Sequence, residues 1–241
     1  MSVLSGPTLE GVRWGQTTRE GGCSVGGYAS FNLAPHVGEA PAITAANWHA
    51  LPRLIGFGRG ELATCHQVHG IQTVHARAGG HHVVDADALY STTAHVGVGV
   101  YTADCVPVLY AVPGRGVAAA HCGWRGAAAG LAGATLRVLA KALDVSASEV
   151  HIWLGASIAQ CSYEVGGELR DVFRDEFLAA RADGKYLLDV GGAVVADLLG
   201  AGASETRVRR STVNTYVDPR CYSYRRDGAG AGRMLSYVRL G

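Results

Sequence analysis

The chain has 241 residues, of which 48% are hydrophobic, and its formal net charge is +1. This length suits one large domain or two small ones, and the apolar content allows a substantial core. The mixed charges without a basic block argue against nucleic-acid or membrane binding. No segment has the pattern of a secretory signal or a membrane span. We therefore expect a cytoplasmic monomer whose six cysteines are free thiols.

The hydrophobic pattern predicts a chain of mixed strands and helices. Short apolar runs with high β propensity predict strands at 72–75, 96–101, 106–112, 117–121, 150–154 and 233–240. A Pro-Gly-Arg-Gly sequence at 113–116 predicts a tight turn between two of these strands. Helical patterns indicate helices at 126–143, 168–182 and 190–199. Because strands and helices alternate only loosely, we expect an α+β (mixed α/β) single domain over 1–241 rather than a doubly wound sheet.

Three short segments, 66–70, 102–107 and 121–126, carry metal-ligand and acid–base side chains beside predicted strand ends or turns. In the second segment, Cys105 follows one predicted strand and precedes another. Pro107 disfavours helix at the residue before it, so we expect Cys105 to lie in a bend. Taken alone, a lone cysteine is more often a small buried apolar residue, and that alternative stays open.

The third segment places His121 at the end of an apolar run and immediately before a predicted helix. The first N–H groups of a helix attract anions, and a guanidinium beside them strengthens the attraction. Arg125 is in that place, so His121 and Arg125 predict an anion site, with phosphate as the obvious ligand. The alternatives are a hydrogen-bonded core histidine and a surface arginine in an ion pair.

The first segment holds His66 and His69, which point in opposite directions if the chain is extended here. One of the two is then expected to reach the site, and Cys65 competes with them as a ligand. Two imidazoles and one thiolate, with a fourth position open, form the ligand set of a catalytic zinc.

Carboxylates near the three segments are the remaining candidates for acid–base or supporting roles. Asp104 precedes Cys105 and is placed to orient a ligand or accept a proton. Asp85 and Asp87 are further candidates. For all three the alternative is a turn or capping residue.

Together these motifs resemble the YfiH family, whose members are also described as laccase-domain or multicopper polyphenol oxidase proteins and as purine nucleoside phosphorylases. The matching signatures are Val-His-Gly at 68–70, Thr-Ala-Asp-Cys-Val-Pro at 102–107 and His-Cys-Gly-Trp-Arg-Gly at 121–126. Further matches extend over nearly the whole chain, at 21–24, 28–33, 36–38, 87–89, 163–165, 223–227 and 232–233.

The resemblance implies a single domain with a layered α/β/β/α core, similar to the catalytic domain of cytotoxic necrotizing factors. It implies a zinc site of His69, Cys105 and His121, which are also the implied catalytic residues. The implied reactions are phosphorolysis of adenosine, guanosine, inosine and methylthioadenosine, with adenosine deamination at the same site. The partners are then a small nucleoside and phosphate, and we assign Arg125, Asn32 and Asp104 to their binding.

The chain departs from the usual family pattern at several places, which bear on substrate preference more than on the ligands. Cys122, Asn214, 47–48 and 156–157 differ from the common residues, and the interval from Cys105 to His121 is one residue shorter than expected.

Three other functions use the same residues. Cys105 and His121 fit a metal-independent cysteine hydrolase, including one that edits peptidoglycan precursors. Copper polyphenol oxidase chemistry is less favoured than zinc, because the chain lacks the paired histidines of a trinuclear copper cluster. A non-enzymatic protein with a closed structural metal site needs a fourth ligand, from Cys122 or His66.

Overall fold

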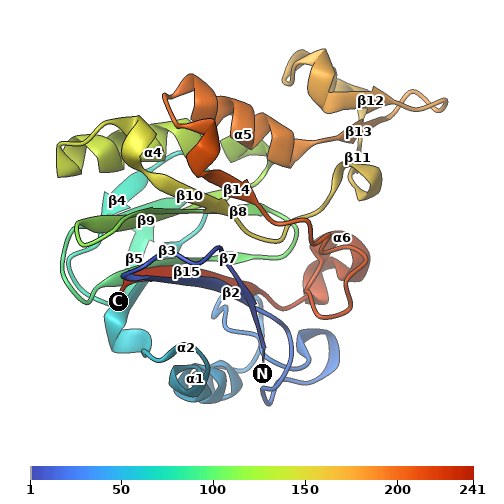
Figure 1. Ribbon diagram of the computed structural model, residues 1–241. Coiled ribbons are helices and arrows are strands. Elements are labelled where there is room, and N and C mark those ends of the chain that lie inside the picture. Colours follow the sequence, from blue (N-terminus) through green and yellow to red (C-terminus); the bar gives the residue numbers. More distant parts are fainter. Residues whose placement is uncertain (1) are drawn as a thin grey trace.

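A computed structural model describes residues 2–241 of the chain. Figure 1 shows four layers, with helices above and below two stacked sheets. The first sheet has six strands in the order β1-β2-β15-β7-β3-β5. Their bounds are Val3–Ser5, Val12–Thr17, Met234–Leu240, Gly97–Thr102, Leu62–His66 and Gly80–Asp85.

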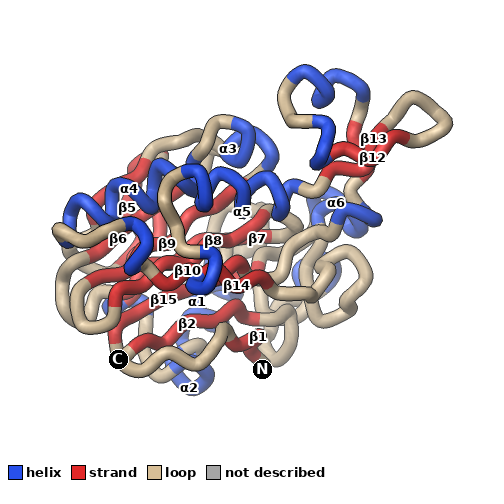
Figure 2. The backbone as a smooth tube through the Cα atoms, turned by 45° about the horizontal axis from the view of Figure 1, so that its top comes forward, coloured by secondary structure: helices blue, strands red, loops and turns tan. Residues whose placement is uncertain are grey.

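The second sheet also has six strands, in the order β14-β10-β8-β9-β6-β4. These are Val208–Arg210, His151–Leu154, Val106–Val112, Gly116–Cys122, Ala88–Ser91 and Thr73–His75. A small third sheet, β11-β13-β12, projects from the main body as an arm and comprises Glu164–Val165, Tyr186–Leu188 and Leu178–Ala180 (Figure 2).

Helices cover the outer face of each large sheet. Helices α4 (Leu131–Leu143) and α5 (Val190–Gly200) lie over the second sheet, and α1 (Pro41–Ala50) and α2 (Pro52–Ile55) lie against the first (Figure 1). Two short helices, α3 (Trp124–Ala128) and α6 (Tyr224–Asp227), lie near one end of the sheets. Among residues 2–241, no helix combines the length and the apolar content that a membrane crossing requires.

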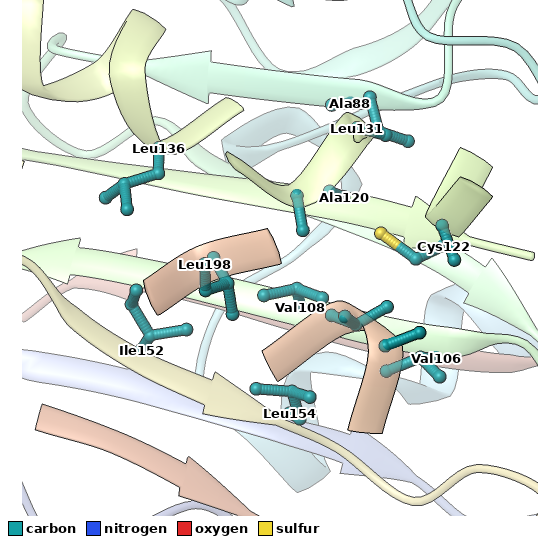
Figure 3. Close-up of a cluster of buried hydrophobic side chains, with 14 of the residues drawn as sticks. Ala88, Val106, Val108, Ala120, Cys122, Leu131, Leu136, Ile152, Leu154 and Leu198 are labelled. Carbon is teal, nitrogen blue, oxygen red and sulfur yellow. The ribbon is translucent and has the colours of Figure 1, made fainter. Parts of the chain in front are cut away.

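Apolar side chains fill the spaces between the layers. Strands β8 and β9 are buried along their whole lengths because the other sheet covers one face and helices cover the other. Leu136 of α4 and Leu198 of α5 pack over Val108 and Ile152 of the sheet (Figure 3). Burying residues of this size typically stabilises the fold by about 1.5–3 kcal/mol each. The central hairpin therefore supplies a rigid base for the loops at its ends.

The predicted layered α+β domain is confirmed, and each predicted strand is present within one or two residues at its ends. The 113–116 turn joins β8 to β9, whose register pairs Val106 with Cys122. The helix expected at 190–199 is α5. The elements that were not predicted are strands β1, β2, β3, β5, β6, β11, β12, β13 and β14 and helices α1, α2 and α6.

Of the other two helix predictions, one was confirmed in part and one was wrong. The helix expected over 126–143 is divided, because Gly130 adopts a left-handed conformation (φ +74°) between α3 and α4. The segment expected to be a helix over 168–182 forms two 3-10 turns, Gly167–Asp171 and Asp175–Phe177, followed by β12. Pairing of β12 with β13 provides backbone hydrogen bonds that outweigh the helical pattern of the sequence.

Candidate metal centre

The structure brings His69, Cys105 and His121 together, one from each of the three sequence segments. Their ligand atoms all lie within 4.8 Å of one another. The two imidazole rings meet edge to face, with centroids 4.8 Å apart. His121 is buried, Cys105 is half-buried and His69 is exposed, so the group opens to solvent on one side.

The register of the central hairpin explains this convergence. Pro107 pairs with His121 and Val106 with Cys122, so Cys105, in the bend before β8, lies beside the end of β9. His69 reaches the same point from the loop after β3. Its backbone has φ +60°, a left-handed conformation that is unusual for a residue other than glycine.

The neighbouring ligand candidates lie elsewhere. Cys65 is buried between the sheets, where its Sγ donates to the Ala86 carbonyl at 3.0 Å. His66 pairs with Asp85 at the surface (2.8 Å). The Cys122 thiol points into the apolar core (Figure 3), and burial raises its pKa well above the usual value. Within residues 2–241 the convergent group therefore consists of three side chains, and none of these candidates adds a fourth ligand.

The Cys105 thiol and the His121 imidazole shift each other's pKa strongly. Burial acts to raise the pKa of Cys105, but the facing His121 and His69 outweigh it and lower that pKa to about 6. Burial acts to lower the pKa of His121, but Cys105 and Asp87 outweigh it and raise that pKa to about 9. These opposite pKa shifts favour a thiolate beside an imidazolium in the metal-free pair near neutral pH, and binding of a metal ion would release the imidazolium proton.

The residues present fit a metal ion by donor chemistry and by shape. A thiolate and two imidazoles suit zinc or copper. Gly123 also keeps space open at the site. A Cβ atom there would lie 3.2 Å from Cys105 Sγ and 2.9 Å from His69 Cδ2.

A cavity of about 500 Å³ opens beside the three side chains. Three arginines contribute to its lining, Arg125, Arg225 and Arg233. Arg125 lies 4.2 Å from the centre of the Trp124 ring, and Arg225 lies 5.0 Å from that of Tyr163. Guanidinium groups around a cavity of this size indicate a small anionic ligand or co-substrate.

Arg125 is in the first turn of α3 rather than before a long helix. Because α3 has only five residues, its dipole adds little, so attraction for an anion comes mainly from the three side chains.

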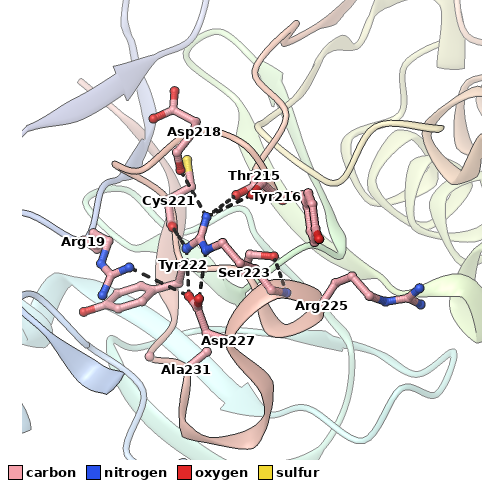
Figure 4. A network of polar contacts seen from close by, with 12 residues as sticks. Arg19, Thr215, Tyr216, Asp218, Cys221, Tyr222, Ser223, Arg225, Asp227 and Ala231 are labelled. Carbon is pink, nitrogen blue, oxygen red and sulfur yellow. Dashed lines mark hydrogen bonds and ion pairs between the residues drawn. The ribbon is translucent and has the colours of Figure 1, made fainter. Parts of the chain in front are cut away.

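A C-terminal strap, residues 214–233, forms one wall of this cavity and carries Tyr224, Arg225 and Arg233. Figure 4 shows how polar contacts hold the strap in its fold. Arg226 donates to the carbonyls of Thr215, Tyr216 and Cys221 at 2.8–3.2 Å and pairs with Asp227.

Asp104, which precedes the candidate ligand Cys105, holds the strap beside the candidate metal centre. Its carboxylate accepts hydrogen bonds from Thr215 Oγ1 (2.6 Å), Ser223 Oγ (3.0 Å) and the Arg225 N–H (2.7 Å). All three donors belong to the strap, and Asp104 itself also lines the cavity.

Asn32 is fully buried and lies outside the cavity lining, with its Oδ1 accepting from the Arg233 N–H at 2.9 Å. Asn32 therefore acts on the cavity through the backbone of Arg233. The sequence patterns also missed Tyr163, Tyr224, Arg225 and Arg233 as cavity residues. Their motifs are in the family signatures, but nothing local in the sequence shows that they face Cys105.

Comparison with known proteins identifies the family. The family described as multi-copper polyphenol oxidoreductase laccase matches residues 13–241. The chain belongs to this laccase-like family. A relative from Deinococcus radiodurans named purine nucleoside phosphorylase is 36% identical over 100% of this chain and 93% of its own length. The Escherichia coli relative, purine nucleoside phosphorylase YfiH, is 34% identical over 97% of this chain and 96% of its own.

Solved structures of similar proteins have the same fold. YlmD from Geobacillus stearothermophilus superposes with a TM-score of 0.88, at 28% identity, over 96% of this chain and 92% of that chain. The Neisseria meningitidis protein NMB0706 has a TM-score of 0.84 at 34% identity, covering 99% and 98% of the two chains. The similarity therefore extends through the arm and the strap as well as the central sheets.

Proposed function

We propose that this protein is a metal-dependent purine nucleoside phosphorylase that uses zinc. The observation that carries the proposal is the placement of His69, Cys105 and His121 on the wall of a cavity that three arginines also line. The names of the relatives support the reaction, and the donor set supports the metal. The substrates we propose are adenosine, guanosine, inosine and methylthioadenosine, with adenosine deamination as a second reaction.

The arginines supply the binding site for phosphate in this proposal. The charges of Arg125 and Arg225 both act to lower the pKa of Tyr163, and Arg233 interacts electrostatically with Cys105. Guanidinium groups bind phosphate oxygens through paired, charge-assisted hydrogen bonds. They hold hydrogenphosphate in place and offset the repulsion that the Cys105 thiolate exerts on it.

In the proposed reaction, a phosphate oxygen forms a bond to the anomeric carbon of ribose while the bond from that carbon to the purine nitrogen breaks. The purine leaves with the electron pair and gains the proton that hydrogenphosphate gives up, so the products are ribose 1-phosphate and the neutral base. When bound by the three ligands, a divalent ion would supply a Lewis acid beside these reacting groups.

Copper chemistry has less support than zinc. A multicopper oxidase requires several ligand groups, whereas the described residues contain one group of three convergent metal-binding side chains.

The test combines metal analysis with a nucleoside panel, each nucleoside measured with and without phosphate. We expect about one zinc per chain, phosphate-dependent release of the base, and loss of both in His121→Ala. Turnover that is unchanged in His121→Ala, or that does not depend on phosphate, would exclude the proposed reaction. Ammonia release from adenosine without phosphate measures deamination separately.

One observation favours a second candidate, a cysteine hydrolase. Asp87 Oδ1 lies 2.8 Å from His121 Nδ1, and His121 interacts with Cys105, so the three side chains follow the order acid, base, nucleophile. Such an enzyme would hydrolyse an amide or ester, including a peptidoglycan precursor. Activity that survives EDTA and is lost on alkylation of Cys105 would favour this candidate over the phosphorylase.

A further inference from the structure

The carboxylate of Asp87 lies buried behind the candidate metal ligands without being one of them. Its side chain is 0% exposed. Strand β6 begins at the next residue, and its register against β9 pairs Ala88 with Ala120, which places Asp87 beside His121. A backbone hydrogen bond also joins the two residues, because the His121 N–H donates to the Asp87 carbonyl at 2.7 Å.

Both carboxylate oxygens of Asp87 accept hydrogen bonds from the segments that carry the two histidines. Oδ1 accepts from His121 Nδ1 (2.8 Å) and from the His69 N–H (3.0 Å). Oδ2 accepts from the N–H groups of Val68 (3.1 Å) and Gly70 (2.6 Å). A buried carboxylate is costly unless such donors replace its water, and here donors from both segments do so.

These contacts act on the two histidines in different ways. For His121, the bond to Nδ1 fixes the ring orientation and leaves Nε2 for the metal site. For His69, consecutive N–H groups surround one carboxylate and hold the backbone at φ +60°. A left-handed residue other than glycine costs roughly 1–2 kcal/mol, so this conformation needs such support.

We propose that Asp87 is the positioning residue that sets His69 and His121 in the geometry for one metal ion. The proposal rests on the metal site of the proposed function and deepens it by assigning the placement of two ligands to one carboxylate outside the ligand set. This role depends both on the negative charge of Asp87 and on the number of hydrogen bonds that its two oxygens accept. An asparagine at this position would turn its NH₂ group toward N–H donors on one side.

The test measures the affinity of the metal-free protein for Zn²⁺ and Co²⁺ by competition with a chromophoric chelator. We expect Asp87→Asn and Asp87→Glu to bind both ions roughly 10- to 100-fold more weakly than wild type. The visible spectrum of the cobalt protein should also change, because the imidazoles are no longer held in the same directions.

Asp85→Asn is the matched control. It makes the same substitution two residues away, where the carboxylate is 73% exposed and pairs with the surface residue His66. We expect this variant to keep the wild-type affinity and cobalt spectrum. Circular dichroism and thermal unfolding without metal establish that each variant is folded. Wild-type affinity and spectrum in either folded Asp87 variant would overturn the proposal.

A measurement on the wild-type protein does not depend on how the variants fold. In protein with ¹⁵N-labelled histidine, we expect the His121 Nδ1–H proton far downfield and slow to exchange, and rapid exchange with water would contradict the proposal. Because none of these measurements uses a nucleoside, a protein that binds metal through Asp87 but shows no phosphorolysis would refute the proposed reaction and leave this inference standing.

Discussion

Gly123 lies against the thiol of Cys105 where the central hairpin ends. A Cβ atom on Gly123 would lie 2.9 Å from His69 Cδ2, closer than real Cβ atoms approach their neighbours, and 3.2 Å from Cys105 Sγ, closer than most do. The absence of a side chain at this position lets two candidate metal ligands from different segments meet.

Gly123→Ala should therefore weaken metal binding. Overpacking costs typically about 1–3 kcal/mol, which corresponds to roughly a 5- to 150-fold rise in the dissociation constant. Gly200→Ala is the control, because a Cβ there meets nothing within 4 Å at the end of α5. Zinc titration of both variants checks the prediction, and equal affinities would show that the site tolerates a methyl group.

The lowered pKa of Cys105 predicts its reactivity in metal-free protein. Only the thiolate reacts with iodoacetamide, so the alkylation rate should stay high at neutral pH and fall as the pH drops through about 6. His121 is the group that does most to lower the pKa of Cys105. His121→Ala should therefore shift the midpoint of the alkylation profile to higher pH. Mass spectrometry of the Cys105 peptide separates it from the exposed Cys23 and Cys161. A midpoint near 9 in wild type would contradict the prediction.

The sequence predicted the central hairpin well and the surroundings of the site poorly, for physical reasons. The runs at 106–112 and 117–121 are continuously apolar because both faces of β8 and β9 are buried, and Pro113 and Gly114 mark the turn. Local pattern is sufficient for such elements. It failed at 168–182, where the end of the segment pairs with β13, a strand just beyond it that the apolar pattern did not predict.

The supporting residues of the site depend on contacts between distant segments. Asp87 reads as a turn residue from its neighbours, yet the β6–β9 register brings it to His121, 34 positions away in the chain. Arg225 reaches the cavity through its N–H bond to Asp104, 121 positions away. No local signal encodes either register, whereas the three ligands were recognisable by residue type and by their resemblance to a family.

Removing the positive charge of Arg225 should weaken phosphate binding selectively. A hydrogen bond to a charged group contributes about 1.5–3 kcal/mol, so Arg225→Met should raise the KM for phosphate roughly 10- to 150-fold. Zinc content should not change. Arg174→Met is the control, because Arg174 is exposed, pairs with Glu176 and does not line the cavity. An unchanged KM for phosphate in Arg225→Met would remove this residue from the anion site.

Arg226 should affect the same kinetic constant indirectly, through the fold of the strap. Its guanidinium donates to the carbonyls of Thr215, Tyr216 and Cys221, and methionine would leave these acceptors without that partner. Each half-buried acceptor left unpaired costs up to about 1–3 kcal/mol. We expect Arg226→Met to lower the melting temperature and to make the strap more sensitive to proteolysis.

Because the strap carries Tyr224, Arg225 and Arg233 to the cavity, Arg226→Met should also raise the KM for phosphate while zinc affinity stays near wild type. Arg220→Met is the matched control. Arg220 is also in the strap but pairs at the surface with Asp218 (2.7 Å). If Arg226→Met lost zinc as readily as phosphate, the strap and the metal ligands would form one cooperative unit, and the separate roles argued for Asp87 and Asp104 would need revision.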